Sequence, residues 1–365
     1  MMTDLDYMVR ALQLAHRGLY TCHPNPRVGC VIVKNGTVVG EGWHQVAGGP
    51  HAEINALKQA DTAAKDATLY VSLEPCSHKG KTGPCTEAII KAGITRVVAA
   101  MLDPNPKVSG RGAQRLRDAG IEVLVGLMAD EAAQLNRGFI MRMTHGRPWV
   151  RCKLAMSLDG RTAMANGASQ WITGTEARAD VHRLRAQSAA IISGIGTVLA
   201  DDPSFTARIE GITDQELFKQ PWRVILDPRL STPPFAKMFS EPGRTLLVTS
   251  SQEQEIVDEL ASVGAEILYQ PLAQESIDLH ALMSYLAEEE INEVLVETGA
   301  TLSGGFLQAG LIDELIIYMA PHLLGHDARG LFNLPELKSL DQRIPLKIKD
   351  IRPIGSDWRI SAEIA

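Results

Sequence analysis

The chain has 365 residues, of which 45% are hydrophobic and 22% are charged, and its formal net charge at pH 7 is −7. This length and composition indicate an ordinary folded protein of roughly two domains and exclude an intrinsically disordered chain. The net acidity argues against a nucleic-acid-binding protein, because such proteins normally carry a basic face.

The N-terminal segment and the cysteines limit the class of protein further. Residues 1–18 contain early acidic side chains and an amphipathic pattern, whereas a signal peptide needs a basic start and an unbroken apolar stretch. No apolar run reaches the ~18 residues of a membrane span, so we expect a cytoplasmic protein that does not contact a membrane. The 5 cysteines are irregularly spaced and odd in number, which favours reduced thiols or metal ligands over a disulfide scaffold.

The first part of the chain alternates between helical and strand patterns. Residues 4–18 show helical spacing of apolar side chains, and the apolar runs 28–33 and 37–43 flank Asn35-Gly36, a strong hairpin signal. A helix is expected to open at His51. Beyond it, strands are expected at 67–76, 96–101 and 121–127, and helices at 86–93, 112–120 and 130–143. This alternation predicts a three-layer α/β domain.

The pattern breaks near residue 147, where Gly146 and Pro148 follow the last of these helices. We therefore expect one domain at 1–147 and a second at 148–365. The second part begins again with strand-like alternation. Further strands are expected at 188–193, 222–228, 244–250, 265–270, 293–298 and 314–321 after a first strand at 149–160, with helices at 177–187 and 277–289. The second domain is therefore also predicted to be α/β.

A candidate metal site lies in the first domain. His51 and Glu53 stand two apart at the start of a helix, and the segment EPCSHKGKTGPC adds Cys76 and Cys85. One imidazole and two thiolates provide three zinc ligands and leave a fourth position open for water, as a catalytic zinc ion requires. Zinc lowers the pKa of water, and a carboxylate outside the ligand set, here Glu53, must then carry protons to a leaving amine.

Each part of this pattern is weak alone, since a His-x-Glu pair or two cysteines are more often structural. Together they follow the order of the zinc deaminase signature, although eight residues separate the cysteines here instead of two. The enlarged loop adds polar and cationic groups that suit a phosphorylated substrate, namely Ser77, His78, Lys79 and Lys81. His78 remains an alternative to Cys85 as a ligand.

The second domain carries a weaker signal. In GIGTVLADDP, Leu199 stands where a dinucleotide-binding fingerprint needs its third glycine. By contrast, residues 293–310 predict a strand, a glycine turn and a helix, an arrangement that directs main-chain N–H groups at an anion such as a cofactor phosphate. Such turns also occur for steric reasons alone, so this pattern leaves phosphate binding open.

Two sets of motifs resemble the family of bifunctional riboflavin biosynthesis deaminase-reductases. HPNPRVGCVIV, HAE, EPCSHKGKTGPC and DPNP are similar to the deaminase half, and KLAMSLDGRTA, SQWIT, LRA, GTVLADDPSFTAR and VETGATLSGG are similar to the reductase half. The resemblance covers almost the whole chain. It implies a cytidine-deaminase-like three-layer α/β/α domain with one zinc ion, followed by a dihydrofolate-reductase-like α/β domain that uses NADPH.

The resemblance also implies three sets of site residues. The deaminase substrate would be contacted by Asn25, His44, Lys81, Asp103 and Asn105. The NADPH cofactor would be contacted by Ala155, Trp171, Thr197, Asp201, Gly299, Ala300, Thr301, Leu302, Ser303, Gly304 and Gly305. The reductase substrate would be contacted by Ser169, Arg185, Phe205, Arg208 and Glu297.

Physical chemistry is compatible with these roles. Arg185 and Arg208 could clamp a phosphate, because a guanidinium binds it in a forked geometry. Lys153 or Asp201 could handle the proton that accompanies hydride transfer. Without the resemblance, the plainer interpretation of an arginine in RLRAQ is a solvated helix face, and that of an Asp-Asp-Pro segment is a turn.

The reaction implied by the resemblance has two steps. The first removes the 2-amino group of 2,5-diamino-6-(5-phosphoribosylamino)pyrimidin-4(3H)-one as ammonia, and the second uses NADPH to reduce the ribosyl group of the product to ribityl, with hydride addition to an opened C=N form. The expected partners are this small phosphorylated pyrimidine and further copies of the chain, which would associate through the reductase half.

Two other functions remain to be weighed. One is a tRNA or single-stranded DNA deaminase with an appended binding domain, which the net acidity and the lack of an aromatic-studded basic stripe disfavour. The other is a non-enzymatic protein with a structural zinc ion and a nucleotide-sensing domain. Three ligands beside Glu53 disfavour it, because a structural site is normally closed by four protein ligands.

Overall fold

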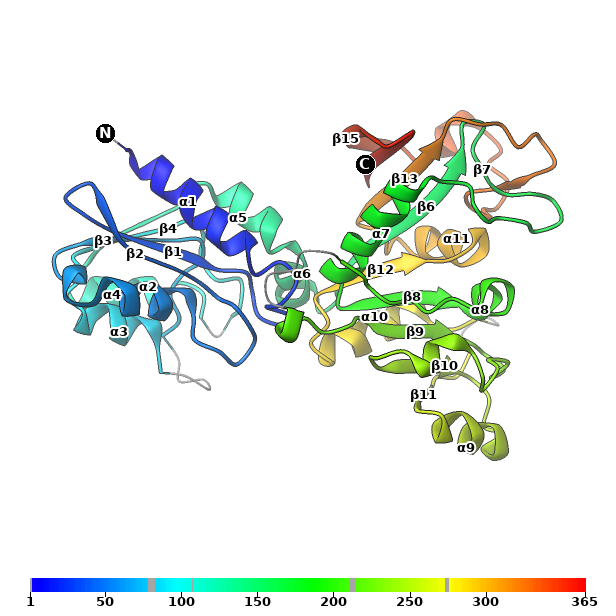
Figure 1. Cartoon of the computed structure of the whole chain (residues 1–365), viewed down its shortest axis with the longest axis horizontal. Helices are drawn as coiled ribbons and strands as arrows, with labels where there is room; N and C mark the ends of the chain where they lie inside the picture. The colour runs from blue at the N-terminus through cyan, green and yellow to red at the C-terminus, as the bar shows by residue number, and fades with distance from the viewer. Residues whose placement is uncertain (1, 78–82, 107, 210–214, 273–275) are drawn as a thin grey trace. The chain divides into compact units, whose positions relative to one another are not determined.

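The computed structural model describes residues 2–77, 83–106, 108–209, 215–272 and 276–365 (Figure 1). The chain divides into two compact units, the first ending at Arg147 and the second beginning at Pro148, with residues 215–218 assigned to the first unit. None of the helices in the described ranges combines the length and the apolar character that a membrane span requires.

The first unit is built on a five-stranded sheet with the order β2-β1-β3-β4-β5. Its strands are β1 (Gly29–Lys34), β2 (Thr37–Trp43), β3 (Thr68–Val71), β4 (Arg96–Ala99) and β5 (Glu122–Val125). β1 runs antiparallel to β2 and β3, while β3, β4 and β5 are parallel. The predicted hairpin is confirmed: Asn35 and Gly36 have φ values of 52° and 77°, the left-handed conformation that a tight turn between β1 and β2 needs.

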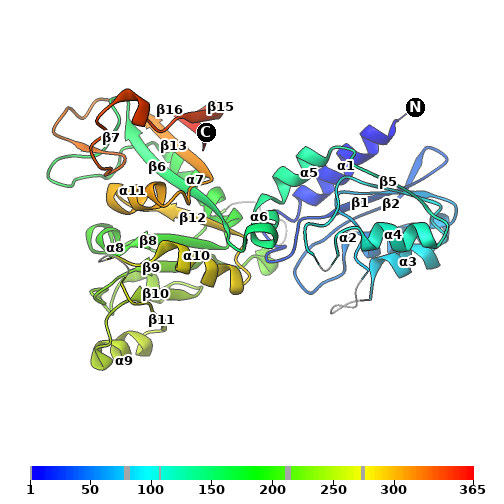
Figure 2. The ribbon, with the colours of Figure 1, turned by 180° about the vertical axis from the view of Figure 1, so that it is seen from behind.

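Helices cover both faces of this sheet (Figures 1 and 2). They are α1 (Asp4–His16) and α5 (Ala129–Leu135) on one face, and α2 (Ala52–Ala60), α3 (Cys85–Lys91) and α4 (Arg111–Asp118) on the other. The alternation along β1 explains the layering, because Ile32 packs in the cluster with α2 and Val31 packs in the cluster with α1. The result is the expected three-layer α/β/α domain.

The prediction of a single helix over residues 130–143 is wrong. Two helices, α5 and α6 (Arg137–His145), meet at Asn136, whose φ of −115° is not helical. The Asn136 side chain is buried; its Oδ1 accepts the Arg27 main-chain N–H at 2.7 Å and its Nδ2 donates to the Arg27 carbonyl at 2.9 Å. The helix breaks here because the asparagine amide pairs with a distant segment of main chain.

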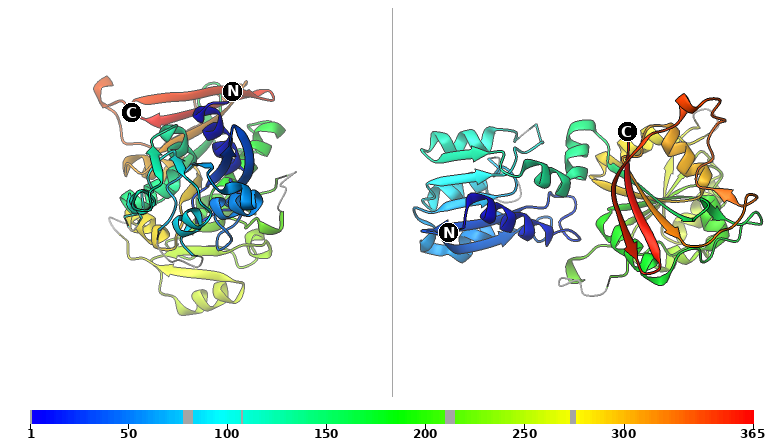
Figure 3. Two further views of the ribbon diagram at one scale, coloured as in Figure 1. Left: turned by 90° about the vertical axis from the view of Figure 1, so that its left-hand side faces the viewer. Right: turned by 90° about the horizontal axis from the view of Figure 1, so that it is seen from above.

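The second unit contains a nine-stranded sheet with the order β11-β10-β9-β8-β12-β6-β13-β16-β15. Its strands are β6 (Trp149–Ser157), β8 (Ala190–Gly194), β9 (Trp222–Leu226), β10 (Thr245–Thr249), β11 (Ala265–Tyr269), β12 (Glu293–Glu297), β13 (Glu314–Ala320), β15 (Leu346–Ile354) and β16 (Asp357–Ile364). All are parallel except the C-terminal hairpin of β15 and β16, red in Figure 3. A separate two-stranded sheet joins β7 (Arg161–Ala163) to β14 (Arg329–Gly330).

Helices also cover both faces of the larger sheet. They are α10 (Leu279–Glu288) and α11 (Ala300–Gln308) on one face, and α7 (Thr175–Gln187), α8 (Ile195–Asp201) and α9 (Gln254–Ser262) on the other. Val296 of β12 packs in the cluster with α10 and α11, whereas Leu295 packs against α7. Because side chains alternate along a strand, Glu297 shares the α7 face with Leu295. Short 3-10 segments occur at Asp61–Ala64, Gln215–Leu217, Lys237–Ser240 and Leu340–Gln342.

Candidate functional site

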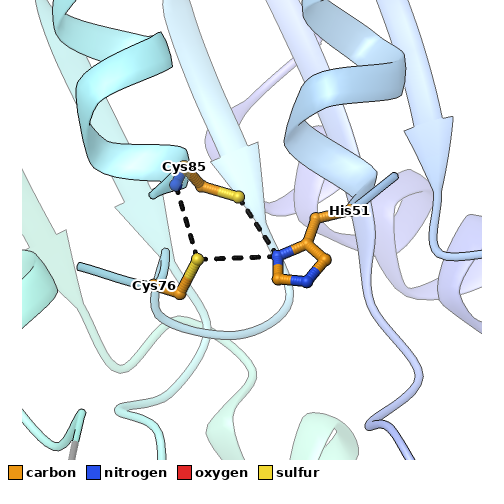
Figure 4. A group of neighbouring side chains, drawn as sticks. All are labelled: His51, Cys76 and Cys85. Carbon is orange, nitrogen blue, oxygen red and sulfur yellow. Dashed lines mark hydrogen bonds between the residues drawn. The ribbon is translucent and has the colours of Figure 1, made fainter. Parts of the chain in front are cut away.

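Three side chains of the first unit converge on one point (Figure 4). His51 caps the N-terminus of α2, Cys76 follows β3, and Cys85 is the first residue of α3. The Nδ1 atom of His51 lies 3.2 Å from Cys85 Sγ and 3.5 Å from Cys76 Sγ. In the part of the chain that the structure describes, these residues form the one group of three or more His, Cys, Asp or Glu side chains that could hold a metal ion.

The donor set fits zinc in chemistry and in spacing. Zinc binds imidazole nitrogen at ~2.0 Å and thiolate sulfur at ~2.3 Å, so tetrahedral coordination separates the two atoms by about 3.5 Å. The two distances from His51 Nδ1 lie close to this value. With three protein ligands, a fourth position remains for water or substrate. The alternative ligand His78 and the expected substrate contact Lys81 lie outside the described residues.

The electrostatics of the triad favour a deprotonated sulfur. Contact with the Cys85 thiol and then with His51 lowers the pKa of Cys76, whereas the neighbouring Cys76 sulfur raises the pKa of Cys85. Contact with Cys76 raises the pKa of His51. A thiolate is the form of cysteine that binds a metal, so this cluster is prepared for a cation.

Glu53 is the second residue of α2 and its side chain is buried. Burial raises its pKa to about 7, with His51 opposing this shift and Cys76 adding to it. A carboxyl group with such a pKa can both accept and release a proton near neutral pH. The start of α2 thus brings together two side chains with different chemistry: the His51 imidazole, which can bind a metal, and the Glu53 carboxyl group, which can exchange a proton.

The structure places Asn25 and His44 next to the triad. His44 Nδ1 lies 3.0 Å from the Pro50 carbonyl, so Nδ1 carries the hydrogen, and Nε2 accepts from Asn25 Nδ2 at 3.0 Å. Burial lowers the pKa of His44, which keeps the imidazole neutral. The ring stands edge-on to that of His51, with 5.5 Å between the ring centroids.

Asp103 and Asn105, the other two expected substrate contacts, lie on the loop after β4. The Asp103 side chain accepts the Asn105 main-chain N–H at 2.8 Å, which fixes the turn between them. The described residues therefore include four of the five expected deaminase substrate contacts.

Sequence analysis missed Glu74, which is buried two residues before Cys76. Its carboxylate accepts three main-chain N–H groups, from Asp103 at 3.0 Å, Gly110 at 2.9 Å and Ala113 at 3.0 Å. Through these hydrogen bonds, Glu74 connects the segment that carries Cys76 with the loop after β4 and with the start of α4. A signal was available, because Glu74 is the one charged residue in the otherwise apolar or uncharged run 67–76.

In the second unit, a charged cluster lies on the α7 face of the sheet. Lys153 of β6 and Glu297 of β12 are register partners on adjacent parallel strands. Arg185 of α7 forms a bidentate ion pair with Glu297, with distances of 2.6 Å and 2.9 Å, and its third nitrogen donates to the Thr206 carbonyl at 3.1 Å. Burial lowers the pKa of Lys153. Burial alone would raise the pKa of Glu297, but Arg185 outweighs it and the net shift is downward.

The expected phosphate clamp of Arg185 and Arg208 is not assembled in this arrangement. The forked edge of Arg185 is bound to Glu297, so it is not presented to a phosphate. Arg208 is exposed, and its side chain contacts His182, with 3.3 Å between Nη2 and Nε2. Sequence analysis could not find the ion pair, because it joins residues 112 positions apart.

Phe205 differs from expectation as well. Its ring is buried in the cluster that contains Ile191 and Val198, so the side chain belongs to the core. Its φ of 49° is unusual for a bulky residue and bends the chain before Thr206. A substrate contact by Phe205 would therefore come from the main chain.

The segment around Ser169 contacts the end of α8. Gln170, which follows Ser169, donates its Nε2 hydrogen to Asp201 at 2.9 Å. The next residue, Trp171, is 70% exposed, and the Arg178 guanidinium lies 4.7 Å from its ring centroid. An exposed tryptophan face held by an arginine is available to a planar ligand.

The glycine turn before α11 fits a cofactor phosphate. Gly299 caps α11 without a side-chain hydrogen bond to the first turn, and a Cβ at this position would meet no atom within 4 Å. The first N–H groups of a helix have no acceptor within the helix, and beside open space they suit an anion. Ser303 and Gly304 are buried, and a Cβ on Gly304 would lie 2.2 Å from the Asn333 carbonyl oxygen, so packing explains this glycine.

The other expected cofactor contacts differ in exposure. Thr301 is exposed, and the partly buried ones are Ala155, Thr197, Ala300, Leu302 and Gly305.

Comparisons with known proteins agree with both halves of this description. The model of the cytidine and deoxycytidylate deaminase zinc-binding region matches residues 1–101, and the model of the RibD C-terminal domain matches residues 148–360. The chain is 51% identical to the riboflavin biosynthesis protein RibD of Escherichia coli (strain K12), over 98% of each chain.

Solved structures cover the same length. Acinetobacter baumannii RibD is 46% identical and superposes with a TM-score of 0.92 over 99% of each chain. A Thermotoga maritima diaminohydroxyphosphoribosylaminopyrimidine deaminase/5-amino-6-(5-phosphoribosylamino)uracil reductase is 33% identical, with a TM-score of 0.87 over 99% of each chain. Both domains and their order along the chain are therefore shared with these proteins.

Proposed function

Because the chain belongs to the RibD family of bifunctional riboflavin biosynthesis enzymes, we propose that each unit contains one of its two active sites. The protein deaminates 2,5-diamino-6-(5-phosphoribosylamino)pyrimidin-4(3H)-one and then reduces the ribosyl group of the product to ribityl with NADPH. The deaminase site belongs to residues 1–147 and the reductase site to residues 148–365. The observation that carries the first assignment is the convergence of His51, Cys76 and Cys85.

In the deaminase, His51, Cys76 and Cys85 hold zinc. When bound, zinc acts as a Lewis acid that makes a water molecule acidic enough to serve as a nucleophile near neutral pH. Glu53 takes up the proton of that water at its carboxylate and delivers it to the departing amine. The support for this role is its buried position beside the triad, which raises its pKa to about 7.

The same proposal assigns the pyrimidine contacts. Asn25 and His44 bind the substrate next to zinc, and their mutual hydrogen bond orients both side chains. Asp103 and Asn105 bind it from the loop after β4, and Lys81 adds a positive charge for the phosphate. The substrate is a small molecule and not a nucleic acid, a restriction supported by the net charge of −7.

In the reductase, bound NADPH would supply the hydride, and the N-terminus of α11 next to Gly299 would hold its phosphate. The turn and first residues of α11, 299–305, contact the cofactor together with Ala155, Trp171, Thr197 and Asp201. The substrate binds beside Ser169, with Arg208 on its phosphate and the Arg185–Glu297 pair next to its sugar. Lys153 donates the proton that accompanies hydride transfer, because burial lowers its pKa and eases release of the proton. Asp201 is the second candidate for this step.

One experiment tests the assignment of both reactions. Ammonia release from the diaminopyrimidinone, bound zinc and NADPH oxidation are measured together for wild type and Glu53→Ala. The variant is expected to keep zinc and to lose deamination, while it still oxidises NADPH when it receives the deaminated product. If the zinc-loaded wild-type protein releases no ammonia from this compound, the substrate assignment fails.

We also propose that the chain forms homo-oligomers through the edge of the larger sheet. β15 is the last strand of that sheet, and apolar side chains on the terminal hairpin are exposed, namely Leu346 (44%), Ile348 (55%), Ile351 (51%) and Trp358 (44%). A free strand edge with apolar side chains is well suited to pair with another copy. Light scattering of wild type and Ile348→Lys tests this: a monomeric wild type contradicts the proposal, and an oligomer unchanged by the substitution places the interface elsewhere.

A further inference from the structure

One main-chain carbonyl of the reductase unit contacts both Arg185 and His182, and His182 in turn contacts Arg208. Thr206 is buried between Phe205, whose φ is 49°, and the segment that leads to Arg208. Its carbonyl oxygen accepts Arg185 Nη1 at 3.1 Å, and His182 Nδ1 lies 3.1 Å from the same oxygen. His182 and Arg185 both belong to α7, so this helix and the 205–208 segment are connected at one point.

Two of the contacts of His182 favour one tautomer. A carbonyl oxygen only accepts, so Nδ1 carries the hydrogen and Nε2 of the neutral ring is an acceptor. Arg208 Nη2 lies 3.3 Å from Nε2, and a guanidinium only donates, so this contact is an Arg208-to-His182 hydrogen bond. The Arg208 main-chain N–H also points at His182 Nδ1 at 3.3 Å, a hydrogen bond that would need the other tautomer. The shorter contact of Nδ1 with Thr206 and the contact of Arg208 Nη2 with Nε2 both favour the hydrogen on Nδ1.

The partners of the two arginines differ in charge. Arg185 is paired with the Glu297 carboxylate, which neutralises it. His182 is uncharged, because burial and then the two neighbouring arginines lower its pKa. Arg208 is therefore oriented by a neutral acceptor and keeps its full positive charge for an anion. One of its five N–H groups is used by His182, which leaves the others for the ligand.

We infer that His182 is a positioning residue for the phosphate of the reductase substrate, acting through Arg208. The inference rests on the proposed role of Arg208. An exposed arginine loses much side-chain freedom when it binds a phosphate, and an arginine already fixed by a neighbour loses less. The imidazole supplies that fixation without cancelling the charge. The alternative is that His182 only packs α7 against the 205–208 segment.

The test is steady-state NADPH oxidation by the full chain with two substrates: the deaminated phosphoribosylaminouracil and its dephosphorylated form. His182→Ala is expected to raise KM for the phosphorylated substrate about tenfold, the size of one lost hydrogen bond to a charged group, with kcat nearly unchanged. With the dephosphorylated substrate, wild type and His182→Ala should have the same KM. His182→Gln retains an acceptor and a donor and should restore most of the wild-type KM.

Two control variants make each outcome decisive. Arg208→Ala should raise KM for the phosphorylated substrate at least as much as His182→Ala; if it has no effect, the phosphate role of Arg208 fails and the inference fails with it. If Arg208→Ala raises KM and His182→Ala does not, only the inference is overturned. His280→Ala, at an exposed position on α10, should resemble wild type.

A purely structural role gives a different pattern. Loss of activity with both substrates, without recovery in His182→Gln, would mean that His182 holds the fold and does not position Arg208. Should His182→Ala fold poorly, which ammonia release and circular dichroism of the same samples reveal, the comparison of His182→Gln with wild type decides in its place. A KM for the phosphorylated substrate within about twofold of wild type in that variant, against a large increase in Arg208→Ala, supports the inference.

Discussion

The Glu74 carboxylate accepts the Asp103 main-chain N–H at 3.0 Å, and this bond joins the segment of a proposed metal ligand, Cys76, to the loop of a proposed substrate contact. Two more N–H groups, from Gly110 and Ala113, complete the environment of the same buried side chain. A carboxylate matches three donors because it has acceptor lone pairs only. Glu74 therefore determines where Asp103 lies relative to Cys76.

Glu74→Gln is expected to disturb this arrangement. The glutamine amide places an NH2 group against main-chain N–H donors, and leaving one buried donor without an acceptor costs about 1–3 kcal/mol. Urea unfolding should show a loss of stability of this size, and KM for deamination should rise. Glu87→Gln is a matched control, because Glu87 is an exposed glutamate paired with Arg115 in the same unit. A Glu74→Gln protein with the stability and KM of the control would contradict the role given to Glu74.

Removal of the metal should separate the two reactions. After treatment with a strong chelator, the protein is expected to release no ammonia, because the proposed ligands all lie in the first unit. NADPH oxidation with the deaminated substrate should continue. Cys85→Ser should reproduce the chelated state with reduced zinc content, whereas Cys152→Ala, which alters a buried thiol of the second unit, should retain zinc. Equal zinc content in both variants would argue against Cys85 as a ligand and would favour His78 as the third ligand.

The sequence predicted the strands that are buried on both faces. The run 28–33 is apolar throughout and the run 293–298 has the apolar centre 294–296, as expected for strands with both faces buried. The candidate zinc ligands could be proposed from the sequence because their residue types and order follow from the chemistry of the ion, and the structure brings the three side chains together.

Other features depended on contacts that no local pattern contains. β15 was missed because LKIKDIRPI is rich in charge, as suits an edge strand with exposed side chains. The break at Asn136 depends on Arg27, more than 100 residues earlier in the chain. Similarly, RLRAQ gives no indication that Arg185 meets Glu297, so the sequence suggested a phosphate clamp where the structure has an ion pair.

The Arg185–Glu297 pair leads to a prediction about stability. Glu297→Gln leaves the Arg185 charge largely buried without its partner, which is expected to cost about 3–5 kcal/mol of unfolding free energy. Replacing both residues, in Arg185→Met/Glu297→Leu, should cost less than this single change because the Arg185 charge is then removed together with its partner. Denaturant unfolding of the single and double variants measures the difference. If the double variant is less stable than Glu297→Gln, the ion pair contributes more to the free energy of unfolding than the neutralisation of two buried charges.

Lys153 leads to a prediction about pH. Burial lowers its pKa from the ordinary value of 10.5, with Arg185 adding to the shift and Glu297 opposing it. A proton donor must be protonated to act, so kcat for reduction should be highest below the pKa of Lys153 and should fall as the pH rises through it. This decline should begin at a lower pH than an exposed lysine would give. Lys153→Met should reduce kcat by about 10²-fold or more, the usual contribution of a general acid, and should abolish the decline.

Asp201→Asn distinguishes the two candidate donors, since Asp201 lies at the end of α8 and receives a hydrogen bond from Gln170. If Lys153 is the donor, Asp201→Asn should retain the alkaline decline in kcat, while Lys153→Met should lose it. Deamination by both variants, measured as ammonia release, should match wild type, because neither residue belongs to the first unit. A pH profile that is unchanged in Lys153→Met and altered in Asp201→Asn would assign the proton to Asp201, and the lowered pKa of Lys153 would then reflect only its burial on the sheet.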